Sequence, residues 1–349
     1  MSMSTLPGRS AAPAAVVPAA VGPLSGAVIG RLTGDDEQAD GLRAAAREVA
    51  SADPYGLDLQ LSLYLGYELH YRGLQGVPSE REWDPDLLRL RADLEGAFLS
   101  ALRGELAGGA DLDAEVAALL TEPVEGRGIS HHLLRDGTLP QLREYIALRS
   151  LYHLKEADPQ AWVIPRLHGA AKAAVVAVEH DEYGAGRADR MHSQLFAEMM
   201  QELGLSSAYG DYLACAPASV LAEVNLMSLT GLHRRLRGAA IGQFAVIELT
   251  SSPGAARLVK AAQRLGAGPA TERFYAEHVE ADAVHEQILR RGVLEPLVAQ
   301  EPEIAADIVF GLQASSLLAG HFADHVLSSW DRGASALRLP AEPASPTNG

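Results

Sequence analysis

Three side chains in one stretch of the sequence, His278, Asp282 and His285, have the types and spacing of metal ligands. Their steps of four and three residues rotate about 400° and then about 700° around an ideal helix, so all three point within about 60° of one another. Neutral imidazole nitrogen and ionised carboxylate suit iron, manganese or zinc. A buried aspartate on such a face loses its hydration unless something satisfies it. We therefore predict that these three residues bind a cation.

Four further residues in other segments could join them. Glu248 lies in the otherwise apolar segment 244–250, where a buried carboxylate is rare, and Glu156 closes a predicted helix. Glu182 and His192 flank a glycine-rich break and are ten residues apart. Each residue has an ordinary alternative: a solvated helix end for Glu156, solvation of the break for Glu182, an arginine partner for Glu248, and a satisfied core position for His192. These alternatives would have to coincide on four separate helices, which favours one shared site.

The composition predicts an all-α fold in which helices position these residues. The chain has 349 residues, of which 48% are hydrophobic but only 5% aromatic, and no segment alternates with period two over a useful length. Nucleotide-binding loops such as GxGxxG after a strand or a P-loop are absent from the sequence. We predict helices over residues 38–51, 57–72, 85–106, 110–120, 139–156, 165–181, 187–203, 219–250, 253–265, 271–293 and 303–330.

Charge and cysteine content exclude several classes of partner. A net charge of −16 with only three lysines argues against nucleic acid or an anionic membrane surface, because phosphate binding needs clustered basic residues. Cys215 is the single cysteine, so the chain has neither an internal disulfide framework nor a cysteine-rich metal site. The sequence contains no run of 18 apolar residues, so we predict no transmembrane helix. We expect a cytoplasmic protein without nucleic-acid or membrane partners.

The candidate ligands resemble, in order and spacing, those of the haem-oxygenase-like diiron oxidases and oxygenases, in particular the bacterial iron-containing redox enzymes. The similarity covers about residues 140–330 and includes the step of ten residues from Glu182 to His192 and the gap of 86 residues from His192 to His278. The residues that carry it are Glu156, the segment 181–184 with Glu182, His192, Glu248, His278, Asp282 and His285.

The resemblance implies a haem-oxygenase-like seven-helix bundle that holds two Fe(II) ions per chain instead of a haem. All seven residues would be iron ligands, with Glu156 and Glu182 at the positions where family members differ, and O₂ would be the co-substrate. The reaction range of the family suggests a small-molecule substrate, namely an amine, an amino acid or a fatty-acid-like compound, and N-oxygenation or oxidative C–C cleavage. Three or four carboxylates would nearly neutralise two divalent ions in the bundle core.

Four regions follow from the composition and the resemblance. Residues 1–34 and 333–349 are rich in small residues and proline and are predicted to be a mobile leader and a disordered tail. Residues 139–332 are predicted to form the metal-binding bundle. Residues 35–138 are predicted to form an N-terminal helical extension that packs on the bundle and is a candidate for homodimer contacts.

Two alternatives stay open at this point. The same bundle could be a single-metal or a manganese enzyme, which would need fewer of the seven ligands. The chain could also be a non-catalytic helical binding or scaffold protein, in which case His278 would matter neither for metal content nor for stability.

Overall fold

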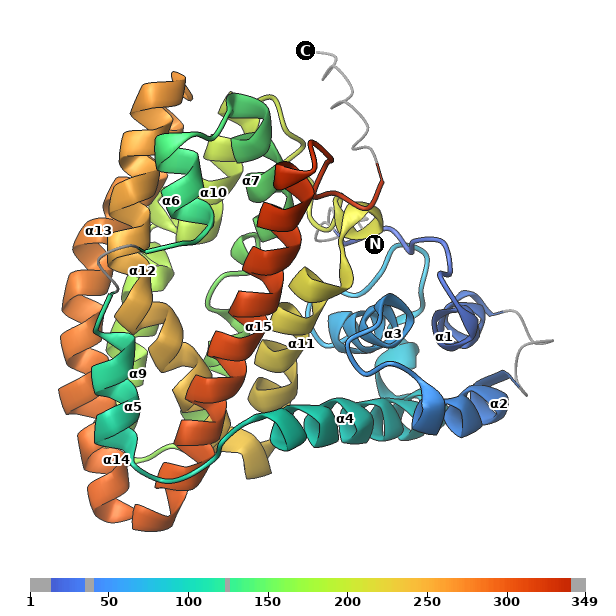
Figure 1. Ribbon diagram of the computed structural model, residues 1–349. Coiled ribbons are helices and arrows are strands. Elements are labelled where there is room, and N and C mark those ends of the chain that lie inside the picture. Colours follow the sequence, from blue (N-terminus) through green and yellow to red (C-terminus); the bar gives the residue numbers. More distant parts are fainter. Residues whose placement is uncertain (1–13, 35–40, 123–125, 340–349) are drawn as a thin grey trace, which may run out of the picture.

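The computed structural model describes residues 14–34, 41–122 and 126–339, and these residues form an all-α protein, as predicted (Figure 1). The β-structure of the described residues is a single bridge between Ala15 and Leu74. The helices are α1 (Pro23–Thr33), α2 (Gly41–Glu48), α3 (Leu57–Glu68), α4 (Pro85–Glu105), α5 (Leu112–Leu119), α6 (Ile129–Arg135), α7 (Leu139–His153), α8 (Asp158–Ala161), α9 (Gly169–Glu182), α10 (His192–Glu202), α11 (Ala218–Leu232), α12 (Arg237–Leu265), α13 (Pro269–Gln287), α14 (Glu295–Gln300) and α15 (Ala305–Asp331).

Helix α12 is central to the bundle, because it packs along both α13 and α15. Two glycines let α12 and α15 approach closely: a Cβ atom on Gly242 would overlap the carbonyl of Ile308, and one on Gly311 would overlap the carbonyl of Ala239. Glycine is therefore required on both sides of this crossing. The crossing fixes the axis of α12, on which Glu248 follows Gly242 by less than two turns.

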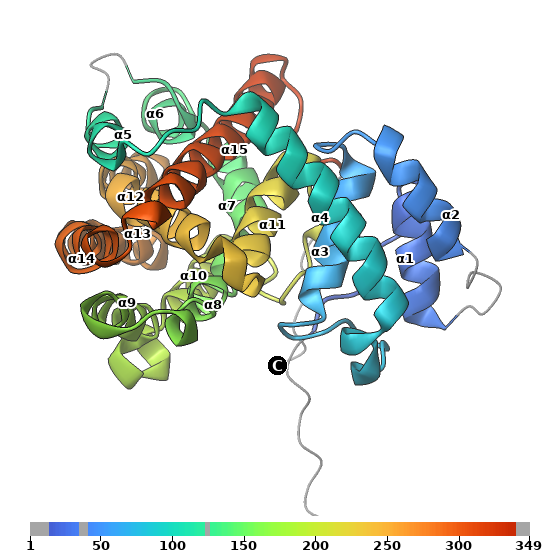
Figure 2. The same cartoon turned by 90° about the horizontal axis from the view of Figure 1, so that it is seen from below.

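The N-terminal helices α1 to α4 form a layer beside the bundle, and both views place them on the same side of it (Figures 1 and 2). Helix α3 packs on α11, where the Asn225 side-chain amide donates to the backbone carbonyl of Gln60 at 2.8 Å. Helices α5 and α6 instead lie against α12 and α15. The division of the chain at residue 138 stays a prediction.

The predicted leader and tail are wrong for the residues that the structure describes there. Part of the leader forms α1, whose residues Leu24, Val28 and Leu32 are buried at helical spacing, and the Asp58 carboxylate accepts from the backbone N–H groups of Leu24 and Ser25 at the helix start. In the tail, Ala336 is buried. The composition of these segments did not predict the contacts, because a segment rich in small residues and proline can still form a short helix with an apolar face. Residues 1–13 and 340–349 lie outside the described residues.

Several predicted helix boundaries are also corrected. The predicted helix 219–250 is two helices, because the Arg166 guanidinium binds the carbonyls of Gly231 and Leu232 at the end of α11. Pro253 lies inside α12 rather than at a helix start. The predicted helices 165–181 and 187–203 begin later, at Gly169 and His192. The short α6 was not predicted, and the predicted helix 271–293 continues from α13 into a π-helical stretch, Ile288–Leu294.

One helical segment in the described chain, Pro302–Asp331, is long and apolar enough to cross a membrane by length and composition alone. Its most apolar window has a mean hydropathy of 1.2 and is 44% buried within the protein. The segment includes α15, which packs on α11 and α12. Core helices of globular bundles pass the same test, so this one segment is weak support for a membrane span.

A fully buried ion pair joins the N-terminal layer to the turn that carries Glu156. Lys155 Nζ donates to Glu68 Oε2 at 2.9 Å, and the side chains are 1% and 0% exposed. The Tyr209 hydroxyl donates to the other Glu68 oxygen at 2.7 Å, and the Lys155 ammonium lies 4.1 Å from the ring centre of Tyr71. This network fixes the residue that directly precedes Glu156.

Replacing Lys155 with methionine should therefore leave the Glu68 carboxylate buried without its cation. We expect Lys155→Met to lower the free energy of unfolding by about 3–5 kcal/mol, measured by urea denaturation, because a lone buried charge keeps its desolvation cost. The double variant Lys155→Met/Glu68→Gln removes both charges and should recover much of the loss. Equal stability of the single and double variants would contradict this coupling.

Candidate metal centre

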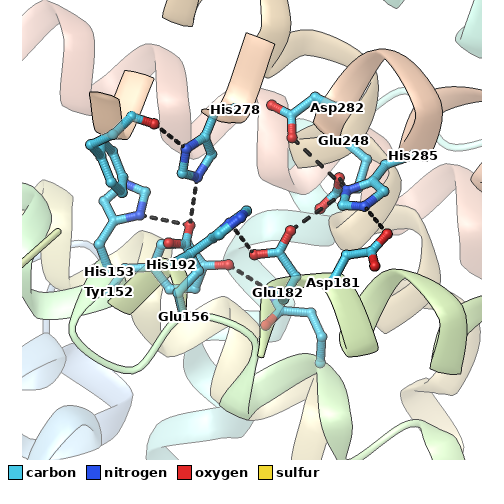
Figure 3. A network of polar contacts seen from close by, with 12 residues as sticks. Tyr152, His153, Glu156, Asp181, Glu182, His192, Glu248, His278, Asp282 and His285 are labelled. Atoms are coloured by element: carbon cyan, nitrogen blue, oxygen red, sulfur yellow. Dashed lines mark hydrogen bonds and ion pairs between the residues drawn. The ribbon is translucent and has the colours of Figure 1, made fainter. Parts of the chain in front are cut away.

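The structure brings all seven candidate ligands together in the bundle core (Figure 3). They come from the turn after α7, from α9, α10 and α12, and from α13, and all seven are buried. They form two groups, in each of which one donor atom per residue lies within 4.8 Å of the others. The first group is Glu156, His192 and His278, and the second group is Glu182, Glu248, Asp282 and His285.

In the first group, a backbone contact orients His278. His278 Nδ1 donates to the carbonyl of Phe274 at 2.8 Å, since a carbonyl can only accept. The lone pair of the neutral ring therefore lies on Nε2, which is 3.8 Å from Glu156 Oε1 and has no hydrogen-bond partner. His153 Nδ1 lies 2.7 Å from the same Glu156 oxygen and holds this carboxylate from the other side. Such contacts behind a ligand orient it in metal sites.

In the second group, His285 is the central residue. Its Nδ1 lies 2.9 Å from Glu248 Oε2 and 3.6 Å from Glu182 Oε1. Its Nε2 lies 3.4 Å from Asp181 Oδ2. A proton on Nε2, donated to Asp181, leaves the lone pair on Nδ1, which faces the other carboxylates and can bind a metal ion. This is the carboxylate–histidine arrangement of many metal sites.

Glu182 lies between the two groups. One of its carboxylate oxygens, Oε2, is 2.7 Å from His192 Nδ1 in the first group, while Oε1 faces His285 in the second. The His192 nitrogen makes no hydrogen bond despite this short distance. A carboxylate with one oxygen toward each group has the geometry of a bridging ligand.

The glycine-rich break after α9 brings Glu182 and His192 together. Gly184 has φ 68°, and a Cβ atom there would lie 2.6 Å from both the Arg190 carbonyl carbon and the Met191 nitrogen. Only glycine adopts this conformation without strain and leaves room for the returning backbone. The break therefore folds back on itself, so that the last residue of α9 faces the first residue of α10.

Gly184→Ala should displace His192 from Glu182. We expect at least about a tenfold loss of metal affinity, similar to the loss of a contact that orients a ligand, measured by Mn(II) titration of the metal-free protein. Gly186→Ala is the matched control, because Gly186 also has a positive φ, 79°, but no atom lies within 4 Å of its added Cβ. An equal loss in both variants would show that backbone strain, rather than the close approach, causes the effect.

The site concentrates carboxylates whose ionisation is unfavourable. Burial raises the pKa of Glu248, and the nearby Glu182 carboxylate raises it further. Burial and then Glu248 raise the pKa of Asp282 to about 8. Glu179, one turn before Glu182, has its pKa raised to about 9 by burial and then by Glu182, and neither of its carboxylate oxygens has a hydrogen-bond partner. The metal-free site therefore takes up protons to balance its charge.

In the first group, the charged forms of the side chains are favoured. Burial opposes the charge of His278, but the Glu156 carboxylate 3.8 Å away outweighs it and raises the pKa of His278 to about 10. Burial likewise disfavours ionised Glu156, yet His153 and His278 hold the pKa of that carboxyl well below its usual value. Protonated histidine thus supplies the positive charge that a metal ion could supply instead.

The residues present fit a metal centre by two observations. Among the described residues, Glu156 Oε2, His192 Nδ1, His278 Nε2 and Asp282 Oδ2 are buried atoms of candidate ligands without a hydrogen-bond partner. Buried polar atoms are normally satisfied, so these four need a partner. Mixed carboxylate and imidazole donors suit iron or manganese. Metal binding would replace the protons that the site otherwise takes up.

The stability of the metal-free protein should fall as pH rises between about 4 and 8. Asp282 has a pKa of about 8 in the folded protein against a usual value of 3.8, so in this range the folded state binds more protons than the unfolded state, and the free energy of unfolding decreases with pH. Thermal unfolding at a series of pH values measures this slope. Mn(II) should raise the melting temperature more at pH 8 than at pH 6, because fewer protons are displaced at the higher pH.

Asp282→Asn is the control for this prediction, since asparagine cannot titrate. Its pH slope in the metal-free state should be smaller than that of the unmodified protein. An unchanged slope would assign the pH dependence to other groups.

Three residues around the site were not among the predicted ligands. His153 orients Glu156, Glu179 is buried behind Glu182, and Asp181 contacts His285 from a half-exposed position. Helical spacing was the available signal for two of them, because His153 precedes Glu156, and Glu179 precedes Glu182, by three residues.

A cavity of about 470 Å³ reaches the site. The candidate ligands that line it are Glu156, Glu182, Glu248, His278 and Asp282. The rest of its wall comes mainly from α7, α11, α12, α13 and α15. Both groups are thus accessible to a small molecule.

The fold and the site together define a helical-bundle protein with a buried carboxylate–histidine centre. The chain belongs to the family of iron-containing redox enzymes, whose family model matches residues 143–320. This match confirms the predicted family and the haem-oxygenase-like all-α fold, and makes the chain an iron-containing oxidoreductase by family.

A curated relative gives a more distant comparison. The chain is 26% identical over 166 residues to a nitrosourea synthase from Streptomyces achromogenes subsp. streptozoticus. The match covers 47% of this chain and 35% of the relative, so the chain corresponds to about a third of that protein's length.

Proposed function

We propose that the protein is a non-haem diiron enzyme that activates O₂ to oxidise a small metabolite. The observation that carries the proposal is the pair of adjacent buried ligand groups, three residues in one and four in the other, with Glu182 between them. Family membership supports iron as the metal. The relative favours N-oxygenation over C–C cleavage. Its name, nitrosourea synthase, describes a product with an N–N=O group, and such a group contains oxidised nitrogen.

The seven residues have distinct roles in this proposal. The first group would hold one Fe(II), the second group the other, and Glu182 would contact both. When bound, the two ferrous ions supply electrons for the reduction of O₂. His153 and the Phe274 carbonyl keep Glu156 and His278 in place while a substrate enters the cavity.

Glu179 is suited to hold a proton beside the site. Its raised pKa, about 9, keeps the carboxyl neutral at pH 7, and it lies one turn from Glu182 on α9. We assign it the role of a proton store for oxygen reduction. We also propose that the protein forms a homodimer and lies in the cytoplasm.

Anaerobic titration with Fe(II) tests the proposal. We expect two irons per chain, measured by metal analysis after desalting, and transient visible absorption when the loaded protein meets O₂. His278→Ala should lower iron affinity at least about tenfold, because it removes a donor of the first group. His180→Ala is the matched control, since this histidine on α9 is exposed and outside both groups.

The stoichiometry separates the alternatives. Binding of fewer than one iron per chain, together with no absorption change on exposure to O₂, would exclude the diiron function. One metal per chain, or tighter binding and activity with Mn(II), would favour the single-metal or manganese enzyme. Unchanged metal content in His278→Ala would favour a binding or scaffold protein.

A further inference from the structure

A partly buried ion pair lies in the wall of the cavity. Arg149 on α7 and Glu223 on α11 both line the cavity, and Arg149 Nη1 donates to Glu223 Oε2 at 2.9 Å. Their side chains are 20% and 11% exposed. Neither residue belongs to the two ligand groups. The pair therefore offers one positive and one negative group to a molecule in the cavity.

The pair is only partly satisfied by the protein. Arg149 Nε is buried and has no hydrogen-bond partner, although the guanidinium lies 5.5 Å from the ring centre of Phe322. Such ion pairs contribute little to stability, because the loss of hydration offsets their attraction. An unpaired N–H group of a partly buried arginine in a cavity wall can instead donate to a ligand carboxylate.

The position of the pair sets the size of the ligand. Arg149 precedes His153 by four residues on the same face of α7, a rise of about 6 Å. His153 in turn contacts Glu156 of the first ligand group. A molecule bound by its polar end at Arg149 would thus extend a few bonds to reach the metal centre.

We propose that the substrate is a zwitterionic amino acid whose carboxylate is bound by Arg149 and whose ammonium group is bound by Glu223. This inference rests on the proposed function for the chemistry at the other end of the cavity. A plain carboxylate would be repelled by Glu223, and a plain amine would be repelled by Arg149. The ion pair thus selects against the other two substrate classes, fatty-acid-like compounds and amines.

The test compares each of the common L-amino acids with its deaminated carboxylate and its decarboxylated amine, for example leucine with 4-methylpentanoate and 3-methylbutylamine. Binding to the full chain loaded with Mn(II) is measured by calorimetry, so no turnover is needed. We expect at least one amino acid to bind roughly 10- to 100-fold more tightly than both of its counterparts, the range for hydrogen bonds to charged groups.

Variants of Arg149 and Glu223 test whether this ion pair causes the preference for amino acids. Arg149→Gln should abolish the preference for the amino acid over the amine, and Glu223→Gln should abolish its preference over the carboxylate. The double variant Arg149→Gln/Glu223→Gln keeps a hydrogen-bonded neutral pair and guards against misfolding of the single variants. Arg257→Gln is the matched control, because Arg257 lines the same cavity but pairs with Glu122 and Ser130.

Two results would overturn the inference: no amino acid binds more tightly than its counterparts, or the preference is lost in Arg257→Gln and kept in the Arg149 and Glu223 variants. The outcome is distinguishable from failure of the proposed function. Selective amino-acid binding without iron-dependent O₂ chemistry would uphold the inference alone, whereas two bound irons without amino-acid selectivity would uphold the function alone.

Discussion

Buried negative charge is the constraint on which the structure depends. Five carboxyl groups, those of Glu156, Glu179, Glu182, Glu248 and Asp282, lie within the bundle core. The charged forms of such groups repel one another strongly at low dielectric constant, so their charge must be balanced by protons or by cations. The one lysine beside them in sequence, Lys155, points away and pairs with Glu68. In the structure the ligand carboxylates pair with histidines, and a bound metal would supply further positive charge.

The surrounding fold holds these groups against their repulsion. The glycine contact between α12 and α15 fixes the helix that carries Glu248, and the turn at Gly184 sets Glu182 against His192. The turn after α7 is also constrained, because Ala157 has φ 74°, a left-handed conformation that costs energy for a residue with a side chain. Each contact acts on the backbone within two helical turns of a candidate ligand, where a small displacement would separate the donor atoms.

Much of the site could be predicted from the sequence, for identifiable reasons. The spacing of His278, Asp282 and His285 follows helical periodicity, and Glu248 is conspicuous among apolar neighbours. The pairing of Glu182 with His192 came from the resemblance, since a backbone that folds back at Gly184 has no periodic signal.

The errors in the fold have a common physical cause. The break between α11 and α12 depends on Arg166, which is 65 residues away from Gly231 in sequence, and α1 depends on Asp58. Both are tertiary contacts that cap a helix end with a distant side chain. Local propensity depends only on nearby residues. The apolar run through residues 219–250 therefore predicted one continuous helix, and the proline-rich composition before residue 34 predicted no helix.

The N-terminal layer has a part in the site although it lies outside the matched region, which begins at residue 143. Glu68 on α3 holds Lys155, and Arg72 donates to the carbonyl of Leu154 at 2.9 Å, so both contacts act on the turn that ends in Glu156. Removal of this layer would expose Lys155 and release the turn. A family member without such a layer must therefore support the corresponding carboxylate by other contacts, and its first ligand group need not have the same geometry.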